Sequence, residues 1–307
     1  MYSDWYHARV SNRAGLVSVK SVQSDFHTHS SASDGALAPA ELRRRARSAG
    51  IELMAITDHD TMAGYNAARA ALDGAAGLRL IPGVELSCRW AATTIHVVGL
   101  GVDSDHPAME AALQLLGQAR RERGETIARR LAALGFPGAL EGAMRQAGES
   151  QLGRPHFAAW LVESGHVEDV ARAFDKYLGQ GKRGDVKAFW PELADAVGWI
   201  TAAGGVAVLA HPLKYRFTRM KLQRLAMDFR AAGGSALEII SGRQTPDQVA
   251  QLQRLARELE LEVSVGSDFH RDSAYGPQLG VKLPTLKGLR GVWERFEAAP
   301  DSRKEDP

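Results

Sequence analysis

The 307-residue sequence has little sulfur and no long apolar run. Its one cysteine, Cys88, has no partner for an intramolecular disulfide, and free thiols are typical of reducing compartments. No run approaches the roughly 18 uncharged apolar residues of a membrane-spanning helix, and no apolar stretch near the start is long enough for a signal peptide. We therefore expect a cytoplasmic protein with no membrane partner.

An excess of charge of either sign is also lacking. The sequence has 38 Lys and Arg against 36 Asp and Glu, a net charge of +2. This excess is too small for a protein that holds long nucleic acid by bulk charge, whereas a nucleotide or another short phosphorylated ligand stays compatible with it. The composition is that of a soluble globular protein, which excludes a disordered or fibrous chain.

Short apolar runs rich in β-branched residues alternate with helical stretches rich in alanine and arginine. The predicted strands are 24–29, 53–59, 78–86, 94–100, 205–211, 236–241 and 262–267. Helices are predicted at 39–49, 191–203, 220–232 and 246–259, several with proline in the first turn, where its missing N–H costs nothing. This alternation predicts an α/β fold in which the strands form a parallel barrel.

Residues 103–187 break the alternation, because they contain about four amphipathic helical stretches and no convincing strand. We interpret them as a helical insertion domain, which divides the barrel into residues 24–102 and 188–297. Residues 1–23 show neither helical periodicity nor strand alternation, so we expect a flexible N-terminal tail. For the same reason we expect residues 298–307 to be frayed.

Histidines and carboxylates lie at or near the ends of most predicted strands. His27 and His29 are two residues apart on a strand, so their side chains can point the same way and bind one ion together. The ends of parallel strands converge on one face of a barrel, where active sites lie, and these side chains should therefore meet. The candidate metal ligands are His27, His29, Asp34, His59, Glu85, His96, His211, Asp268 and His270.

Each candidate has an ordinary structural alternative when taken alone. His96 can be a satisfied core histidine, and Asp34 can cap the turn before Gly35. Asp58 and Asp60 flank His59 and can either orient it or cap the strand end. Taken together, the set indicates a metal cluster too large for one ion, so we expect two or three divalent ions with a bridging carboxylate.

The pattern His27-x-His29, Asp34, Thr57-Asp58-His59, Glu85, His96, His211 and Asp268-x-His270 resembles the PHP (polymerase and histidinol phosphatase) family of metal-dependent phosphoesterases. The resemblance covers residues 24 to about 292 and implies a distorted (β/α)7 barrel with a helical insertion. It implies Mn2+ as the first expectation, with Fe2+ or Zn2+ as alternatives. It also implies three ions, one held by His27, His29, Glu85 and Asp268, a second by Glu85, His96 and His211, and a third by Asp34, His59 and His270.

Such a cluster suits phosphate ester hydrolysis, because ions about 3.5 to 4 Å apart stabilise both the attacking and the leaving oxygen. The expected nucleophile is a metal-bound hydroxide held by Glu85, His96, His211 and Asp268, since metal binding lowers the pKa of water. Cys88 is then not needed as a nucleophile.

The insertion contains Gly153-Arg154-Pro155-His156 at a predicted helix start, where a guanidinium and free N–H groups suit a phosphate. An ordinary solvated side chain is the other interpretation of Arg154. The insertion and the stretch 237–243 resemble the PHP subgroup that acts on nucleoside 3′,5′-bisphosphates and on the 5′ ends of short RNA. The resemblance implies that Arg154, His156 and Arg243 contact the substrate.

We therefore expect a phosphatase that removes the 3′-phosphate of nucleoside 3′,5′-bisphosphates, such as adenosine 3′,5′-bisphosphate, to give the 5′-monophosphate and phosphate. We also expect 5′-3′ exonuclease activity on short 5′-phosphorylated RNA, and no obligatory protein partner. The alternatives are a histidinol-phosphate phosphatase, a non-catalytic PHP module that supports a polymerase, and a metal-independent binding protein. Basic residues in the insertion favour the nucleotide, and the complete ligand set argues against the non-catalytic module.

Overall fold

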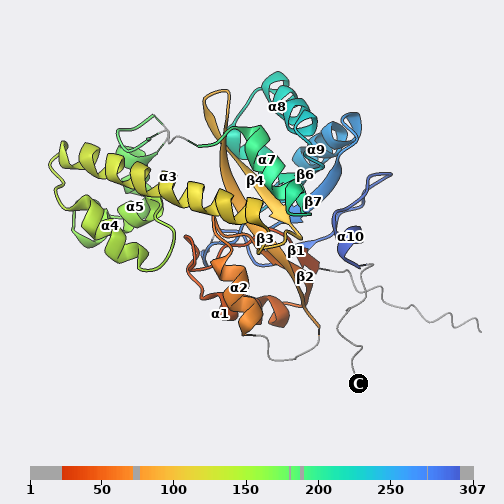
Figure 1. The fold of residues 1–307 in the computed structure, drawn as a ribbon, viewed down its shortest axis with the longest axis horizontal. Coiled ribbons are helices and arrows are strands. Elements are labelled where there is room, and N and C mark those ends of the chain that lie inside the picture. The colour runs from red at the N-terminus through yellow and green to blue at the C-terminus, as the bar shows by residue number, and fades with distance from the viewer. Residues whose placement is uncertain (1–22, 72–76, 180, 187–189, 275, 298–307) are drawn as a thin grey trace, which may run out of the picture.

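The computed structural model describes residues 23–71, 77–179, 181–186, 190–274 and 276–297. The predicted flexible tail, apart from Gln23, and the predicted frayed end lie outside these residues. The chain forms a curved sheet that nearly closes into a barrel, with helices around it and a separate group of helices to one side (Figure 1).

Eight strands make up the sheet, in the order β7-β6-β5-β4-β3-β2-β1-β8. They are β1 (Gln23–Asp25), β2 (Ile51–Ile56), β3 (Arg79–Trp90), β4 (Thr93–Leu100), β5 (Val206–Leu209), β6 (Ala236–Ser241), β7 (Glu262–Gly266) and β8 (Val281–Lys282). The sheet closes after β1, where Phe26 N–H donates to Val265 O at 3.1 Å and Asp268 N–H donates to His27 O at 2.8 Å. All seven predicted strands are present, and the short β8 was not predicted.

The direction of β4 corrects the prediction of an all-parallel barrel. Neighbouring pairs among β1, β2 and β3 and among β5, β6 and β7 are parallel, but β4 is antiparallel to both β3 and β5. A tight turn joins β3 to β4 through Ala91 and Ala92, which have φ angles of 44° and 60°. Turns of this kind usually carry Asn-Gly or Asp-Gly, so the Ala-Ala sequence gave no hairpin signal. His96 therefore lies inside a strand and not at its carboxyl end.

Six helices surround the sheet: α1 (Pro39–Ser48), α2 (Ala63–Ala70), α7 (Leu193–Ala202), α8 (Arg219–Ala231), α9 (Pro246–Glu258) and α10 (Trp293–Glu297). Local sequence fixes several of their starts. Thr245 caps α9 by accepting the Gln248 N–H at 3.3 Å, and Pro246 occupies the first turn. In the described ranges, no helix combines the length and the apolar character needed to cross a membrane.

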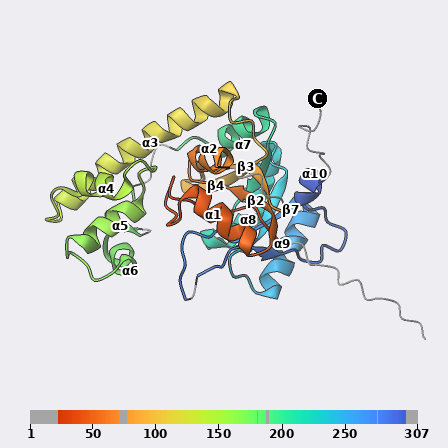
Figure 2. The ribbon, with the colours of Figure 1, turned by 90° about the horizontal axis from the view of Figure 1, so that it is seen from below.

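A short 3-10 helix, η2 (Pro212–Tyr215), follows β5. Four α-helices and a π-helix form the group at the side: α3 (Pro107–Ala132), α4 (Ala139–Ala147), α5 (Arg154–Glu163), α6 (Val170–Ala173) and the π-helix η1 (Phe174–Leu178). Figure 2 shows α3 running from the barrel into this group. Met109 and Leu116, in its first half, are buried in the barrel core, whereas Ile127 and Leu131, in its second half, are buried in a separate core with Phe157. One continuous helix therefore belongs to both hydrophobic cores.

Candidate metal centre

The nine candidate ligands come from six parts of the chain and converge on one end of the barrel. His27, His29 and Asp34 follow β1, His59 follows β2, Glu85 lies within β3, His96 lies within β4, His211 follows β5, and Asp268 and His270 follow β7. Four groups of these side chains have ligand atoms within 4.8 Å of one another. The structure therefore brings together all nine residues singled out from the sequence.

Glu85 lies at the centre of the cluster and is fully buried. Its Oε1 is 3.0 Å from His96 Nδ1 and 2.9 Å from His211 Nε2. Its Oε2 is 2.9 Å from His59 Nδ1 and 3.3 Å from Nε2 of both His27 and His29. One carboxylate thus faces five imidazole rings, an arrangement that suits a carboxylate shared between cations.

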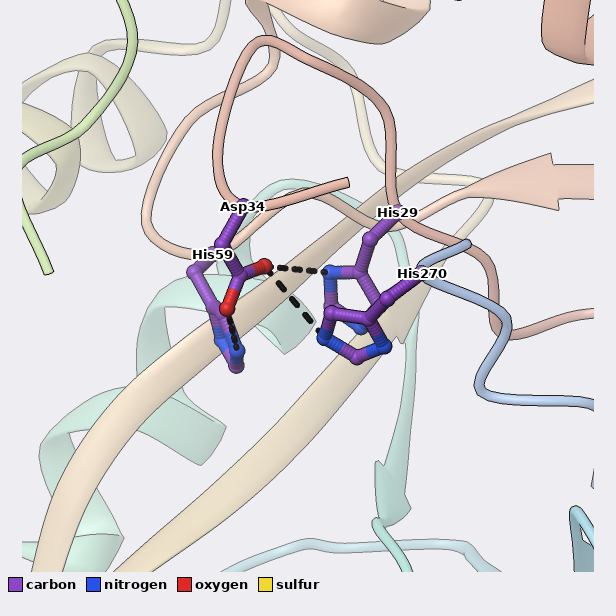
Figure 3. Close-up of side chains that lie close together, drawn as sticks. All are labelled: His29, Asp34, His59 and His270. Carbon is purple, nitrogen blue, oxygen red and sulfur yellow. Dashed lines mark ion pairs between the residues drawn. The ribbon is translucent and has the colours of Figure 1, made fainter. Parts of the chain in front are cut away.

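Asp34 and Asp268 collect the remaining ligand atoms. Asp34 Oδ1 is 3.3 Å from His270 Nε2 and 3.8 Å from His29 Nδ1, and Asp34 Oδ2 is 3.9 Å from His59 Nε2 (Figure 3). Asp268 Oδ1 is 3.3 Å from His29 Nε2 and 3.7 Å from His27 Nε2. The three carboxylates divide the histidines into overlapping sets, as a cluster of several ions requires.

Unpartnered atoms in the buried part of the cluster test whether it fits metal ions. Nε2 of His27, both ring nitrogens of His29, and Oε2 of Glu85 are buried and have no hydrogen-bond partner among the described residues. Leaving such atoms unpaired is costly, because water cannot reach them. Histidine nitrogens and carboxylate oxygens are common ligands of divalent transition metals, so the residues present fit such ions.

Burial also keeps several of the histidines in the neutral form that binds metal. It lowers the pKa of His96 to about 4 and the pKa of His29 well below its usual value, and the nearby rings of His270 and His59 lower the pKa of His29 further. Burial alone would raise the pKa of Glu85, but the imidazoles of His59, His96 and His27 bring it well below its usual value. Glu85 is therefore an anion at the centre of the cluster.

Glu238, on β6, orients two of the ligands and was not singled out from the sequence. Its Oε1 is 2.9 Å from His27 Nδ1, and its Oε2 accepts the backbone N–H of His211 at 2.6 Å. Burial would lower the pKa of His27, but Glu238 and Glu85 raise it to about 10. A carboxylate on the outer nitrogen of a ligating histidine fixes the direction of the ring. A search of strand ends could not find Glu238, because it lies in the middle of a strand.

Asp58 and Asp60 do not hydrogen-bond the ring of His59, which they flank in the sequence. Asp58 accepts hydrogen bonds from the backbone N–H and the hydroxyl of Ser30, at 2.7 and 2.6 Å, and so holds the loop after β1. Asp60 accepts the Ser87 N–H at 2.6 Å and pairs with Arg120 of α3, with Nε to Oδ2 also 2.6 Å. Both therefore brace the backbone around the site.

A cavity of about 410 Å³ lies between the candidate metal centre and the inserted helices. Its wall includes Asp34, His59 and His96 of the centre. The other polar and aromatic wall residues include Arg120, Arg123, Arg154, Phe174, Asp185, Trp190, Lys214 and Tyr215. The cavity thus joins the cluster of ligands to a group of cations, and the described residues add two carboxylates to its wall, Asp34 and Asp185.

The three predicted substrate-binding residues lie in different surroundings. Arg154 lines the cavity at the start of α5, donates to Leu178 O at 3.1 Å and lies 3.7 Å from Asp185. His156 is buried, and its Nδ1 accepts the Gly153 N–H at 3.0 Å, so it caps the helix that carries Arg154. Arg243 is exposed beyond β6 and is not part of the cavity wall.

Arg120, Arg123 and Trp190 are cavity residues that the sequence did not reveal. The guanidinium carbons of Arg120 and Arg123 lie 5.6 and 5.7 Å from the centre of the Trp190 ring. Burial lowers the pKa of Arg123 to about 9, and the charges of Arg154 and Arg120 add to that effect. Mutual repulsion of this kind indicates a place where an anion would be stabilised.

Comparisons with known proteins give consistent matches. A model of the PHP domain matches residues 25–133. A 5′-3′ exoribonuclease of Haemophilus influenzae is 43% identical over 272 residues, covering 89% of this chain and 98% of that protein. A 3′,5′-nucleoside bisphosphate phosphatase of Chromobacterium violaceum is 42% identical over 277 residues, which cover 89% of this chain and 96% of that protein. The solved structure of an amidohydrolase from Chromobacterium violaceum, with bound sulfate and no metal, superimposes with a TM-score of 0.81 at 41% identity, covering 89% of this chain and 95% of that one.

Proposed function

The chain belongs to the PHP domain family, and we propose that it is a metal-dependent phosphoesterase that removes the 3′-phosphate of nucleoside 3′,5′-bisphosphates. The products are the nucleoside 5′-monophosphate and inorganic phosphate. On short RNA with a 5′-phosphate, the same cleavage of the O3′–P bond releases the first nucleotide as a 5′-monophosphate. The relatives named as a bisphosphate phosphatase and an exoribonuclease support both substrates.

We assign the metal ligands as three overlapping sets around Glu85, Asp34 and Asp268. His27, His29, Glu85 and Asp268 would hold one ion, Glu85, His96 and His211 a second, and Asp34, His59 and His270 a third. Mn2+ is our first expectation, with Fe2+ or Zn2+ as alternatives. Such ions lower the pKa of a coordinated water and neutralise charge on phosphate oxygens. Glu238 keeps the His27 ring in the direction this assignment needs.

The observation that carries the proposal is the single cavity that joins the ligand cluster to the arginines of the insertion. A nucleoside 3′,5′-bisphosphate has two phosphates separated by one nucleoside, so it can occupy both ends of the cavity at once. Arg154 and Arg123 bind the 5′-phosphate in this arrangement, while the 3′-phosphate lies over the metal ligands. Binding energy from the remote phosphate then positions the ester that is cut.

Neighbouring residues support the two phosphate positions. Arg120 is held by Asp60 at the foot of the cavity, and Trp190 Nε1 is buried without a partner in the described residues. Lys214 pairs with Asp268 and adds positive charge beside the 3′-phosphate. His156 positions Arg154 by capping its helix and does not itself contact the nucleotide in this arrangement. Three aromatic side chains in the cavity wall reduce the access of water to the bound nucleotide. They are Phe174, Trp190 and Tyr215.

The same proposal assigns separate tasks to the two parts of the chain. The barrel, residues 24–102 and 188–297, carries the metal ligands, and the helical insertion, residues 103–187, carries most of the cations for the 5′-phosphate. We also propose a cytoplasmic location, which is supported by the unpaired, buried thiol of Cys88.

The choice of substrate tests the proposed function directly. The measurement is kcat/KM for adenosine 3′,5′-bisphosphate beside the 5′-monophosphate, the 3′-monophosphate and histidinol phosphate, each with Mn2+, Fe2+, Co2+ and Zn2+. We expect the bisphosphate to react faster than either monophosphate, because only the bisphosphate reaches both ends of the cavity. A preference for histidinol phosphate, or release of the 5′-phosphate, would refute the proposal.

Replacing Arg154 with alanine should raise KM for the bisphosphate by roughly 10- to 150-fold. This corresponds to about 1.5 to 3 kcal/mol, the usual strength of a hydrogen bond to a charged group. Bound metal should not change, and hydrolysis of the 3′-monophosphate should change little, because it lacks the 5′-phosphate. Arg145→Ala, on the exposed side of α4, is the matched control. An unchanged KM in Arg154→Ala would remove Arg154 from the phosphate site.

A further inference from the structure

We propose that the segment after β5 binds the phosphate backbone of RNA on the 3′ side of the bond that is cut. We call this segment the basic ridge and define it by Lys214, Arg216, Arg219, Lys221 and Arg224. This inference rests on the proposed hydrolysis of 5′-phosphorylated RNA and extends it to the nucleotides beyond the first.

The charge of the basic ridge is unusual for this chain. Its five cations fall within eleven residues, and no carboxylate occurs from Pro212 until Asp228, although the whole chain is nearly neutral. Its three arginines, Arg216, Arg219 and Arg224, are exposed, and their side chains make no hydrogen bond or ion pair with any residue in the described part of the chain. Positive charge without partners inside the protein favours an external anion.

Other exposed arginines show the contrast. Arg44 lies 2.7 Å from Glu41, Arg295 lies 2.8 Å from Glu262, and Arg230 pairs with Glu260. In these places the chain supplies its own carboxylate. Along the basic ridge, Lys214 pairs with Asp268, but no carboxylate among the described residues pairs with Arg216, Arg219 or Arg224.

Aromatic side chains fix the basic ridge against the candidate metal centre. The Tyr215 ring lies 5.4 Å from the His211 ring and 5.7 Å from the Phe217 ring, which in turn lies 5.8 Å from Trp90. The Tyr215 hydroxyl accepts the His96 N–H at 2.9 Å and donates to Ala210 O at 3.0 Å. Tyr215 therefore holds the start of the basic ridge beside His96 and His211, two residues assigned as metal ligands.

Cations and aromatic rings alternate at the start of the basic ridge. Lys214 and Arg216 are exposed, whereas Tyr215 and Phe217 between and after them are half-buried. Lys221 Nζ lies 4.0 Å from the centre of the Phe217 ring, and this cation–π contact fixes a third cation of the basic ridge next to Lys214 and Arg216. The result is a row of charges presented to solvent on a fixed backbone, which suits the phosphates of a single strand.

The direction of the substrate decides which basic surface the RNA follows. The 5′-phosphate lies at the insertion and the phosphate that is cut lies at the metal ligands, so the next nucleotides must leave past another wall of the cavity. Lys214 and Tyr215 form part of that wall, and α8 continues from them on the side of the sheet away from the insertion (Figure 1).

A second basic hollow lies on the insertion itself, lined by Arg129, Arg130 and Arg183. Arg130 Nη1 donates to Arg183 O at 3.0 Å, while the side chain of Asp185, on the same segment, lines the cavity. The residues that line this hollow do not line the cavity, so in the proposed arrangement they do not contact the nucleotides on the 3′ side of the bond that is cut. The hollow gives a matched control with the same loss of charge.

The test compares the variant R216A/R219A with the control R129A/R183A and the wild type. Each is assayed with adenosine 3′,5′-bisphosphate and with a 5′-phosphorylated RNA of about ten nucleotides, over a range of salt concentrations. We expect R216A/R219A to lower kcat/KM for the RNA by about 10-fold at low salt and to leave the bisphosphate unchanged. The slope of log kcat/KM against log salt for the RNA should become shallower by about 1.4, or 0.7 for each lost phosphate contact. The control should behave as the wild type does.

Three results would overturn the basic ridge as an RNA-binding surface. They are unchanged RNA hydrolysis in R216A/R219A, an equal loss on the bisphosphate and the RNA, and a loss confined to R129A/R183A. Fluorescence anisotropy of labelled RNA on the metal-depleted full-length protein separates this inference from the proposed function. Weaker binding by R216A/R219A than by the wild type supports the inference even if neither nucleotide is hydrolysed, and wild-type protein that binds no RNA refutes it.

Discussion

Replacing Glu85 with glutamine should lower kcat/KM for the bisphosphate by about 10,000-fold, or ~5.5 kcal/mol, and should reduce bound metal. Glutamine has nearly the same shape, but it removes the negative charge that faces five imidazoles within 3.3 Å. A shared carboxylate sets the spacing of the ions it bridges, so the loss should affect more than one ion. Metal content by mass spectrometry and steady-state kinetics are the measurements.

A control distinguishes loss of the metal centre from loss of the fold. Glu52→Gln changes an exposed glutamate on β2 and should leave metal content and kinetics as in the wild type. Circular dichroism of both variants reports the fold directly. Full metal content and normal turnover in Glu85→Gln would mean that this carboxylate is not a ligand.

Replacing Arg120 with methionine should lower the free energy of unfolding by about 3 to 5 kcal/mol. The Arg120 and Asp60 side chains are 8% and 0% exposed, so the change leaves a buried carboxylate with no cation beside it. Asp60 would keep only the Ser87 N–H, which cannot compensate its charge. Urea unfolding followed by circular dichroism gives the free energy.

The neighbouring residue and a double variant complete this experiment. Arg121 lies next to Arg120 on α3 but is exposed, and Arg121→Met should cost no more than about 0.5 kcal/mol. Adding Asp60→Asn to Arg120→Met removes the unpaired charge and should restore part of the lost stability. If the double variant were as unstable as the sum of the single variants, the pair would not be coupled and its electrostatic explanation would fail.

The candidate ligands could be predicted because they are metal-binding residue types at positions that a barrel brings together. His59, His211 and Asp268 follow strands whose apolar runs are visible in the sequence, and the carboxyl ends of parallel strands meet. His96 was predicted as a ligand because it is a histidine within a predicted strand. The direction of that strand was not predicted, because Ala91 and Ala92 form a turn in which alanine is rare.

The supporting residues could not be predicted, because nothing local distinguishes them. Glu238 is a single carboxylate within an apolar strand, and its role depends on His27, 211 residues away in the sequence. Arg120 lies in a helix rich in arginine, and its sequence neighbours Arg121 and Glu122 are exposed. Only the packing of α3 against the barrel turns Arg120 inward, and that packing depends on contacts distant in the sequence.

The continuous helix α3 has a consequence for how long a substrate can be between its two phosphates. Arg120 and Arg123 both lie on α3. The first half of this helix packs in the barrel core, and its second half packs in the core of the inserted helices. An α-helix advances 1.5 Å per residue and resists stretching, so the separation between these guanidinium groups and the ligand cluster is nearly constant. In the proposed function, this constant separation selects substrates whose two phosphates are one nucleoside apart, and the selection does not depend on the base.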